Sequence, residues 1–140
     1  GARTSLTLYP GAVPMAENVF INLKNRSHSV TASVGVPKGG AEGVIIAQGG
    51  RFSGWSLYVK NGRASYAYNW LGRETYKVAD PAKLPEGPVT VRMDFAYDGG
   101  GRGKGGTVTM TVNGRKVAEG RVKASPERDR FICSARTKWI

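Results

Sequence analysis

The residues that could carry out nucleophilic chemistry lie around His28, the single histidine of this 140-residue chain. A hydrolase triad needs a serine beside a histidine whose second ring nitrogen is oriented by a carboxylate. Serines at three positions and carboxylates at two would satisfy this pattern formally: Ser27, Ser29 and Ser53, with Asp94 and Asp98. No nucleophile-elbow motif or characteristic spacing accompanies them. We therefore interpret His28 as a structural or interface residue.

Metal and glycosidase chemistry also lack the residues that they need. A zinc site takes three or four nitrogen and sulfur ligands, and the chain has one histidine and one cysteine, Cys133. Glycoside hydrolysis needs two carboxyl groups that face each other about 5–9.5 Å apart. Among the acidic residues, only Asp94 falls in the middle of an expected strand. The sequence thus predicts no catalytic residue, no metal site and no cofactor bound by this chain.

The segment from Gly99 to Gly106 is rich in glycine and matches G-x-G-x-x-G, the pattern of a dinucleotide-binding turn. That motif works only where a helix follows, because the amide groups of the helix hold the pyrophosphate. A strand pattern follows here, so we predict a surface loop. Its two cations, Arg102 and Lys104, remain candidates for contact with an anionic ligand.

Nearly every segment alternates apolar and polar residues with a period of two, which is typical of half-buried antiparallel strands. The segments are 30–36, 55–60, 64–70, 75–78, 89–97 and 107–112, with a continuous apolar run at 43–48 and an opening strand at Leu6 and Leu8. Asn61-Gly62 and Asn113-Gly114 predict two-residue hairpins. About eight to ten short strands with turn signals between them indicate an all-β sandwich or barrel.

Aromatic residues between positions 55 and 76 could form a platform on which sugars stack. Alternation places Trp55 in the core with Leu57 and puts Tyr58 on the opposite, exposed side. Tyr66, Tyr68 and Trp70 share one face, where they either pack in the core or line a groove; we favour the core. The residues that a glycan-binding interpretation would use are Tyr58, Tyr66, Tyr68, Trp70, Arg102 and Lys104.

The formal net charge is +11, and it is distributed unevenly. Residues 101–140 carry ten Lys/Arg and three Asp/Glu, a net of +7, which leaves +4 for the first hundred residues. Such a basic end suits either a polyanionic partner or a solvated surface. Because the basic residues are dispersed, we favour the solvated surface and expect no specific nucleic-acid binding. No apolar run approaches the 18 or so residues of a membrane span, so we expect no membrane partner.

Several motifs resemble the C-terminal region of large bacterial arylsulfatases. They are Asn25-Arg26-Ser27-His28-Ser29-Val30, the run 40–52 that ends in Gly49-Gly50-Arg51-Phe52, the strand 54–59 and the stretch 94–108. The broader pattern is similar to concanavalin A-like and laminin G-like sandwiches. The resemblance runs from about Arg3 to Arg130 and implies one antiparallel β-sandwich domain, a jelly roll at residues 1–130. A divergent basic tail, residues 131–140, would follow it.

In the arylsulfatase family, the chemistry belongs to a preceding α/β domain. There a cysteine in a C-x-P-x-R motif is converted to formylglycine beside a calcium ion. The stretch Cys133-Ser134-Ala135-Arg136-Thr137 departs from this motif, with alanine at the proline position and threonine at the arginine position. The resemblance therefore implies a non-catalytic C-terminal domain of an arylsulfatase-like sulfuric ester hydrolase. Its partner would be the catalytic domain of the parent chain.

For that contact between domains, the candidates are Asn25, Arg26 and His28, with Arg51 and Phe52 as a second choice. One alternative is a carbohydrate-binding module for acidic or sulfated glycans. Another is unspecific binding of polyanions, which would depend steeply on salt. Homo-oligomerisation stays open. The compartment, bacterial cytoplasm or periplasm, also stays open, and we find no signal peptide in this sequence.

Overall fold

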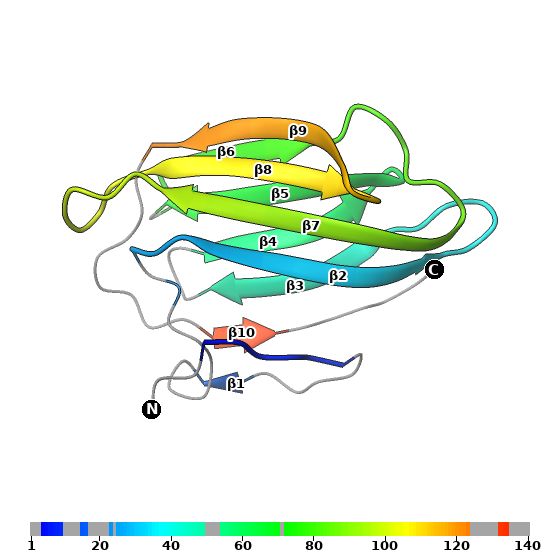
Figure 1. Cartoon of the computed structure of the whole chain (residues 1–140), viewed down its shortest axis with the longest axis horizontal. Helices are drawn as coiled ribbons and strands as arrows, with labels where there is room; N and C mark the ends of the chain where they lie inside the picture. Colours follow the sequence, from blue (N-terminus) through cyan, green and yellow to red (C-terminus); the bar gives the residue numbers. More distant parts are fainter. Residues whose placement is uncertain are drawn as a thin grey trace.

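The computed structural model is a sandwich of two antiparallel β-sheets (Figure 1). It describes residues 4–9, 15–16, 23, 25–49, 54–70, 72–123 and 132–134, and none of these is helical. The described part accordingly has no helix that is long and apolar enough to cross a membrane. This architecture confirms the predicted all-β sandwich.

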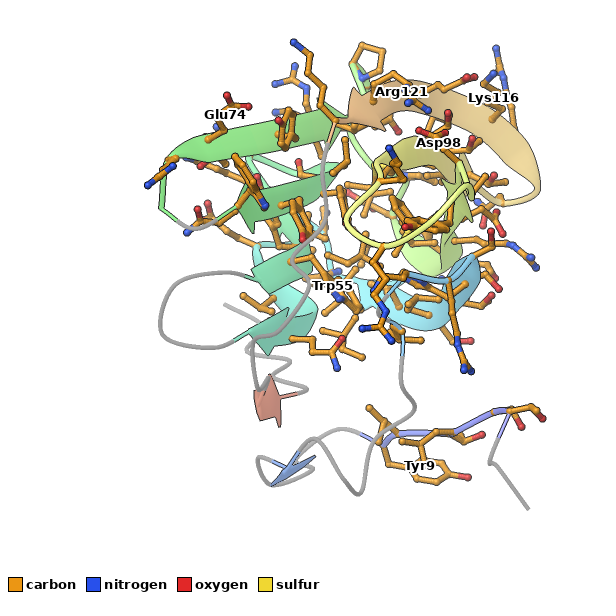
Figure 2. All side chains as sticks on the ribbon, turned by 90° about the vertical axis from the view of Figure 1, so that its left-hand side faces the viewer. Tyr9, Trp55, Glu74, Asp98, Lys116 and Arg121 are labelled. Carbon is orange, nitrogen blue, oxygen red and sulfur yellow. The ribbon has the colours of Figure 1, made fainter. Side chains whose placement is uncertain are left out.

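The larger sheet has six strands and the smaller has four. The order in the six-stranded sheet is β1 (Met15–Ala16), β10 (Ile132–Ser134), β3 (Gly43–Gly49), β4 (Gly54–Lys60), β5 (Arg63–Trp70) and β6 (Glu74–Ala79). The order in the four-stranded sheet is β2 (His28–Val36), β7 (Gly87–Tyr97), β8 (Gly106–Val112) and β9 (Arg115–Val122). Figure 2 shows the two sheets facing each other, with side chains between them.

The core lies between the sheets and is filled by alternate residues of each strand. Leu57 of β4 and Tyr66 of β5 project from one sheet, and Met93 of β7 and Met110 of β8 project from the other; all four are at most 2% exposed. Fully burying such a side chain contributes roughly 1.5–3 kcal/mol. Trp55, 7% exposed, is also in the core, as its alternation predicts.

The two Asn-Gly turns were predicted correctly. Asn61 and Gly62 have φ angles of 52° and 74°, and Asn113 and Gly114 have φ angles of 49° and 78°. Two consecutive residues with positive φ are the signature of a type I′ turn, whose twist matches that of the flanking strands. These turns join β4 to β5 and β8 to β9.

Three details of the structure were not predicted or differ from prediction. Residues 4–9 form no strand, although Leu6 and Leu8 are half-buried and Leu8 packs against the core. Strand β10 falls within the expected tail, where it pairs with the edge of β3 at residues 47–49. An open sheet edge offers unpaired backbone groups to any nearby segment. The apolar run 43–48 is buried only in part, because a bulge between Val44 and Ile46 breaks its alternation.

Candidate functional site

His28 is the first residue of β2, and its ring projects into the sandwich. The ring centroid lies 6.0 Å from that of Trp55 in β4 and 5.2 Å from that of Phe95 in β7. Because β4 and β7 belong to different sheets, His28 joins the two layers at one end of the core. This placement, half-buried on the inward face of β2, suits a structural role, and the contact of His28 with another domain stays a prediction.

The hydrogen bonding of His28 defines its tautomer. Nδ1 lies 3.1 Å from the carbonyl oxygen of Arg26, and since a carbonyl only accepts, Nδ1 must carry the proton. Nε2 is buried, and no hydrogen-bond partner for it exists among the described residues. Burial lowers the pKa of His28 below its usual value, and the Arg26 carbonyl opposes this only in part. The ring is therefore neutral near pH 7.

The residues of the formal triad line one cavity without forming a triad. This open cavity of about 360 Å³ is lined by Ser27, His28, Ser29, Asp94, Phe95 and Ala96. Ser29 pairs with Asp94 across β2 and β7, and alternation points both outward, away from the His28 ring. Asp94 instead accepts hydrogen bonds from Arg92 at 2.9–3.1 Å. Ser53, the third predicted nucleophile, lies outside the described residues.

The other carboxylate of the formal triad, Asp98, anchors a loop. Its two oxygens accept hydrogen bonds of 2.7 and 2.6 Å from Arg121, and Figure 2 shows the pair together. The hydrogen bond from Arg121 is the main reason that the pKa of Asp98 is lowered. The backbone amide of Asp98 also donates to the Gly105 carbonyl, at 3.0 Å. These contacts hold together the two ends of the loop at residues 98–105, hereafter the glycine loop.

The side chains of Asn25 and Tyr97 form hydrogen bonds with the backbone of the glycine loop. The Asn25 side-chain oxygen accepts a hydrogen bond of 2.9 Å from the amide of Gly103. The Tyr97 hydroxyl accepts one of 3.1 Å from the amide of Lys104 and lies within hydrogen-bonding distance of Asn25 Oδ1 and the Gly101 carbonyl. The predicted surface loop is thus a hydrogen-bonded structure.

Residues 25–28 connect the glycine loop to the core. Asn25 has a φ of 53°, a left-handed conformation that asparagine tolerates better than most residues. The hydroxyl of Ser27 accepts a hydrogen bond of 2.9 Å from the amide of Tyr97. We call residues 25–27, Tyr97 and the glycine loop the polar rim. The structure therefore unites two groups of residues that the sequence analysis treated separately.

Tyr97 was not predicted as part of this site, and Ser27 was considered only as a nucleophile. The sequence signal for a role of Tyr97 was weak, because Tyr97 ends an alternating strand and its position in the pattern predicts only one more strand residue. Its partners in the rim are up to 72 positions away in the chain. Only the antiparallel pairing of β2 with β7, in which His28 lies opposite Phe95, brings them together.

The polar rim presents cations to solvent. Arg26, Arg102 and Lys104 are all exposed. Arg26 follows Asn25 directly, and Asn25 bonds to Gly103 between the other two cations. The carboxylate of the loop, Asp98, is already paired with Arg121. The rim is therefore a positively charged surface on a hydrogen-bonded backbone.

The aromatic platform, which we weighed against core packing, would need tyrosine rings that the core buries. Tyr66 and Tyr68 are 2% and 6% exposed, so they belong to the core, as we favoured, and their rings are unavailable to a glycan. Burial also raises the pKa of Tyr66 well above its usual value. Trp70 is half-buried against the core. Tyr58 is half-buried as well, but it alternates with Trp55 and so faces outward, on the opposite side of the sheet.

Arg51 and Phe52 lie outside the described residues. Among the residues that the structure does describe, no group of three or more histidine, cysteine or acidic side chains is arranged to hold a metal ion.

Comparison with known proteins gives a fold. No family model matches the sequence, and no curated protein matches it either. Among solved structures, the chain is similar to the mouse laminin alpha1 chain, domains LG4-5, with a TM-score of 0.55 and 20% sequence identity. The match covers 80% of this chain and 28% of that chain. An arrangement of two antiparallel sheets that superposes at this level identifies the fold as a laminin G-like jelly-roll β-sandwich.

Proposed function

We propose that this chain is a non-catalytic β-sandwich domain of an arylsulfatase-like sulfuric ester hydrolase, and that it packs on or assists the catalytic domain. The observation that carries the proposal is the position of His28. Its ring lies beside Trp55 and Phe95, while the carboxylates of Asp94 and Asp98 are bound to Arg92 and Arg121. A laminin G-like sandwich fits a non-catalytic or binding role.

The proposed parent enzyme rests on the motifs that resemble bacterial arylsulfatases. Of the predicted contact residues, Arg26 is exposed, Asn25 is half-buried within the rim, and His28 is half-buried at the start of β2. We therefore propose the polar rim as the surface that meets the catalytic domain, with Arg26 as its first contact. The formylglycine and calcium chemistry of the family would reside in that other domain.

Two measurements test this proposal. The chain by itself should hydrolyse 4-nitrophenyl sulfate no faster than buffer does. Turnover that persists in a Cys133→Ala variant would overturn the non-catalytic assignment, because that variant removes the one cysteine. The reading frame that encodes the chain should also encode a sulfatase domain with a C-x-P-x-R motif. A frame without one would overturn the proposed parent.

The exposed cations of the rim favour a second candidate function, the binding of sulfated or acidic glycans. A sulfate group is recognised by basic side chains held in fixed positions. Arg102 and Lys104 flank Gly103, whose amide bonds to Asn25, so the backbone that carries both cations is constrained. Of the residues in the glycan-binding prediction, this proposal retains Arg102 and Lys104. The binding surface is now the polar rim and no longer the aromatic platform.

Binding of heparin, used as the probe, separates a rim site from a general charge effect. We expect Arg102→Ala/Lys104→Ala to weaken binding about tenfold, equivalent to 1.4 kcal/mol. The control is Lys60→Ala/Lys77→Ala, which removes the same charge from exposed positions in the six-stranded sheet. Equal losses in both double variants would show unspecific attraction, and no binding at about 50 mM salt would eliminate the glycan proposal.

A further inference from the structure

We propose that His28 is a pH sensor that controls the order of the glycine loop. With His28 neutral, the loop is held and presents Arg102 and Lys104 at the polar rim; with His28 protonated, the ring leaves the core and the loop is released. The use of this switch rests on the proposed function, in which the rim is a contact surface. The switch itself can be measured without any ligand.

The slot that holds the His28 ring has walls from both sheets. Trp55 of β4 and Phe95 of β7 both lie beside the imidazole, at interplanar angles of 37° and 36°. Trp55 is fixed in turn, because its indole N–H donates a hydrogen bond of 3.0 Å to the buried Gln48 side chain. The slot is therefore shaped for a flat, uncharged ring.

A second proton on His28 would have to go to Nε2. Nδ1 already carries a proton for the Arg26 carbonyl, and Nε2 is buried with no acceptor within reach in the described part of the chain. A charged imidazolium without a hydrogen-bond partner is costly to bury. Attraction to the faces of the two aromatic rings offsets only part of that cost.

No carboxylate faces the His28 ring to stabilise its charged form among the described residues. From β4 and β7, the facing groups are the uncharged Trp55 and Phe95. Tyr66 of β5 lies behind Trp55, stacked at 6.2 Å, and it gains no charge in acid. Asp94, which flanks Phe95, points outward to Arg92. Burial thus lowers the pKa of His28, in agreement with this geometry.

The contacts of residues 25–28 would transmit the change to the loop. His28 holds the Arg26 carbonyl, Ser27 accepts from the Tyr97 amide, and Asn25 accepts from the Gly103 amide. These residues are consecutive, so displacement of the His28 ring pulls directly on the bonds of its neighbours. Tyr97, which also bonds to the loop at Lys104, would lose its link to Ser27.

The sign of the pH dependence follows from the lowered pKa. Above about pH 6.5, the usual pKa of histidine, the ring is neutral in both the held and the released states. Below that value, the released state binds a proton that the held state does not. The equilibrium then shifts toward release by about tenfold per pH unit, until the pH reaches the pKa of the held state.

The experiment uses NMR and amide hydrogen exchange on the whole chain. Because the chain has one histidine, its imidazole C–H resonance reports the His28 pKa directly, and we expect a value below that of histidine in a denatured sample. Exchange in the glycine loop, corrected for intrinsic rates, should accelerate by up to about tenfold between pH 7 and about pH 5.5. The pairing of Asp98 with Arg121 is unaffected there, since the pKa of Asp98 is lowered.

The control variant is His28→Phe, which fills the slot with a ring that does not titrate. Corrected loop exchange in this variant should be the same at both pH values because no imidazole titrates, and His28→Gln provides a second variant that does not titrate if the first fails to fold. A normal His28 pKa would overturn the proposal, as would equal acceleration of loop exchange in wild type and variants. Because none of these measurements uses a glycan or a catalytic domain, a failure here is distinguishable from a failure of the proposed function.

Discussion

At the scale of single residues, Asn25 gives the sharpest test of the polar rim, because its side-chain oxygen accepts the Gly103 amide. Asn25→Gly keeps the φ of 53° accessible but removes this acceptor. Asn25→Asp keeps an acceptor in the same place. A net hydrogen bond is worth about 0.5–1.5 kcal/mol, so we expect loop exchange to become several-fold faster in Asn25→Gly and to change little in Asn25→Asp. Equal effects in both variants would contradict the assigned contact.

The same residue scale shows what sequence could and could not predict about the site. His28 was predicted as a structural or interface residue because a lone histidine lacks partners for catalysis, and the structure places its ring beside Trp55 and Phe95. Tyr97 escaped prediction because its significance comes from Asn25, which is 72 positions away. Arg102 and Lys104 were identified by charge alone, which is local information. Their fixed backbone depends on contacts between segments that are distant in sequence.

At the scale of elements, two glycines in strands provide a matched pair. A Cβ on Gly120 of β9 would lie 2.5 Å from the Val78 side chain of β6, whereas a Cβ on Gly35 of β2 would have no atom within 4 Å. Gly120→Ala should therefore separate β9 from β6 and lower the free energy of unfolding by about 1–3 kcal/mol. Gly35→Ala should be neutral or stabilise by about 0.4–1 kcal/mol, since it restricts the unfolded chain.

Urea unfolding of both variants checks this prediction. A loss in Gly35→Ala as large as that in Gly120→Ala would mean that glycine is needed in these strands for backbone reasons and not for the approach of β9 to β6. The positions suit the comparison because neither has the positive φ that would itself strain an alanine.

Elements were predictable where their signals are local. The Asn-Gly turns and the period-two strands are encoded by adjacent residues, and both were found where expected. Strand β10 was not predicted, because three residues become a strand only when an edge such as that of β3 is available. Leu6 and Leu8 have the alternation of a strand, but residues 4–9 have no ladder in the structure. Alternation in the sequence predicts which face of a segment is buried. The segment becomes a strand only where a partner strand is available for pairing.

At the scale of the whole molecule, alternation predicts two layers of strands but not the order of the strands within each sheet. Strand β2 pairs with β7, with Val36 opposite Gly87 and His28 opposite Phe95, although four strands of the other sheet lie between them in the sequence. Nothing within either strand specifies this pairing. The fold was nevertheless predictable at the level of class, because alternating burial on many short strands leaves few arrangements other than a sandwich.

Because the two sheets share one core, we expect them to unfold together. Met110 of β8 is 0% exposed, and Met110→Ala should lower the free energy of unfolding by about 2–5 kcal/mol. The effect should reach the opposite sheet, where Trp55 reports the transition by fluorescence in a background that carries Trp70→Phe and Trp139→Phe. Far-ultraviolet circular dichroism should give the same, equally shifted midpoint, as expected for two-state unfolding.

Thr109→Ala, a neighbouring substitution on the outward face of β8, should change stability by no more than about 0.5 kcal/mol. A Met110→Ala variant whose Trp55 signal keeps the parental midpoint while the circular dichroism shifts would show that the sheets are separate units.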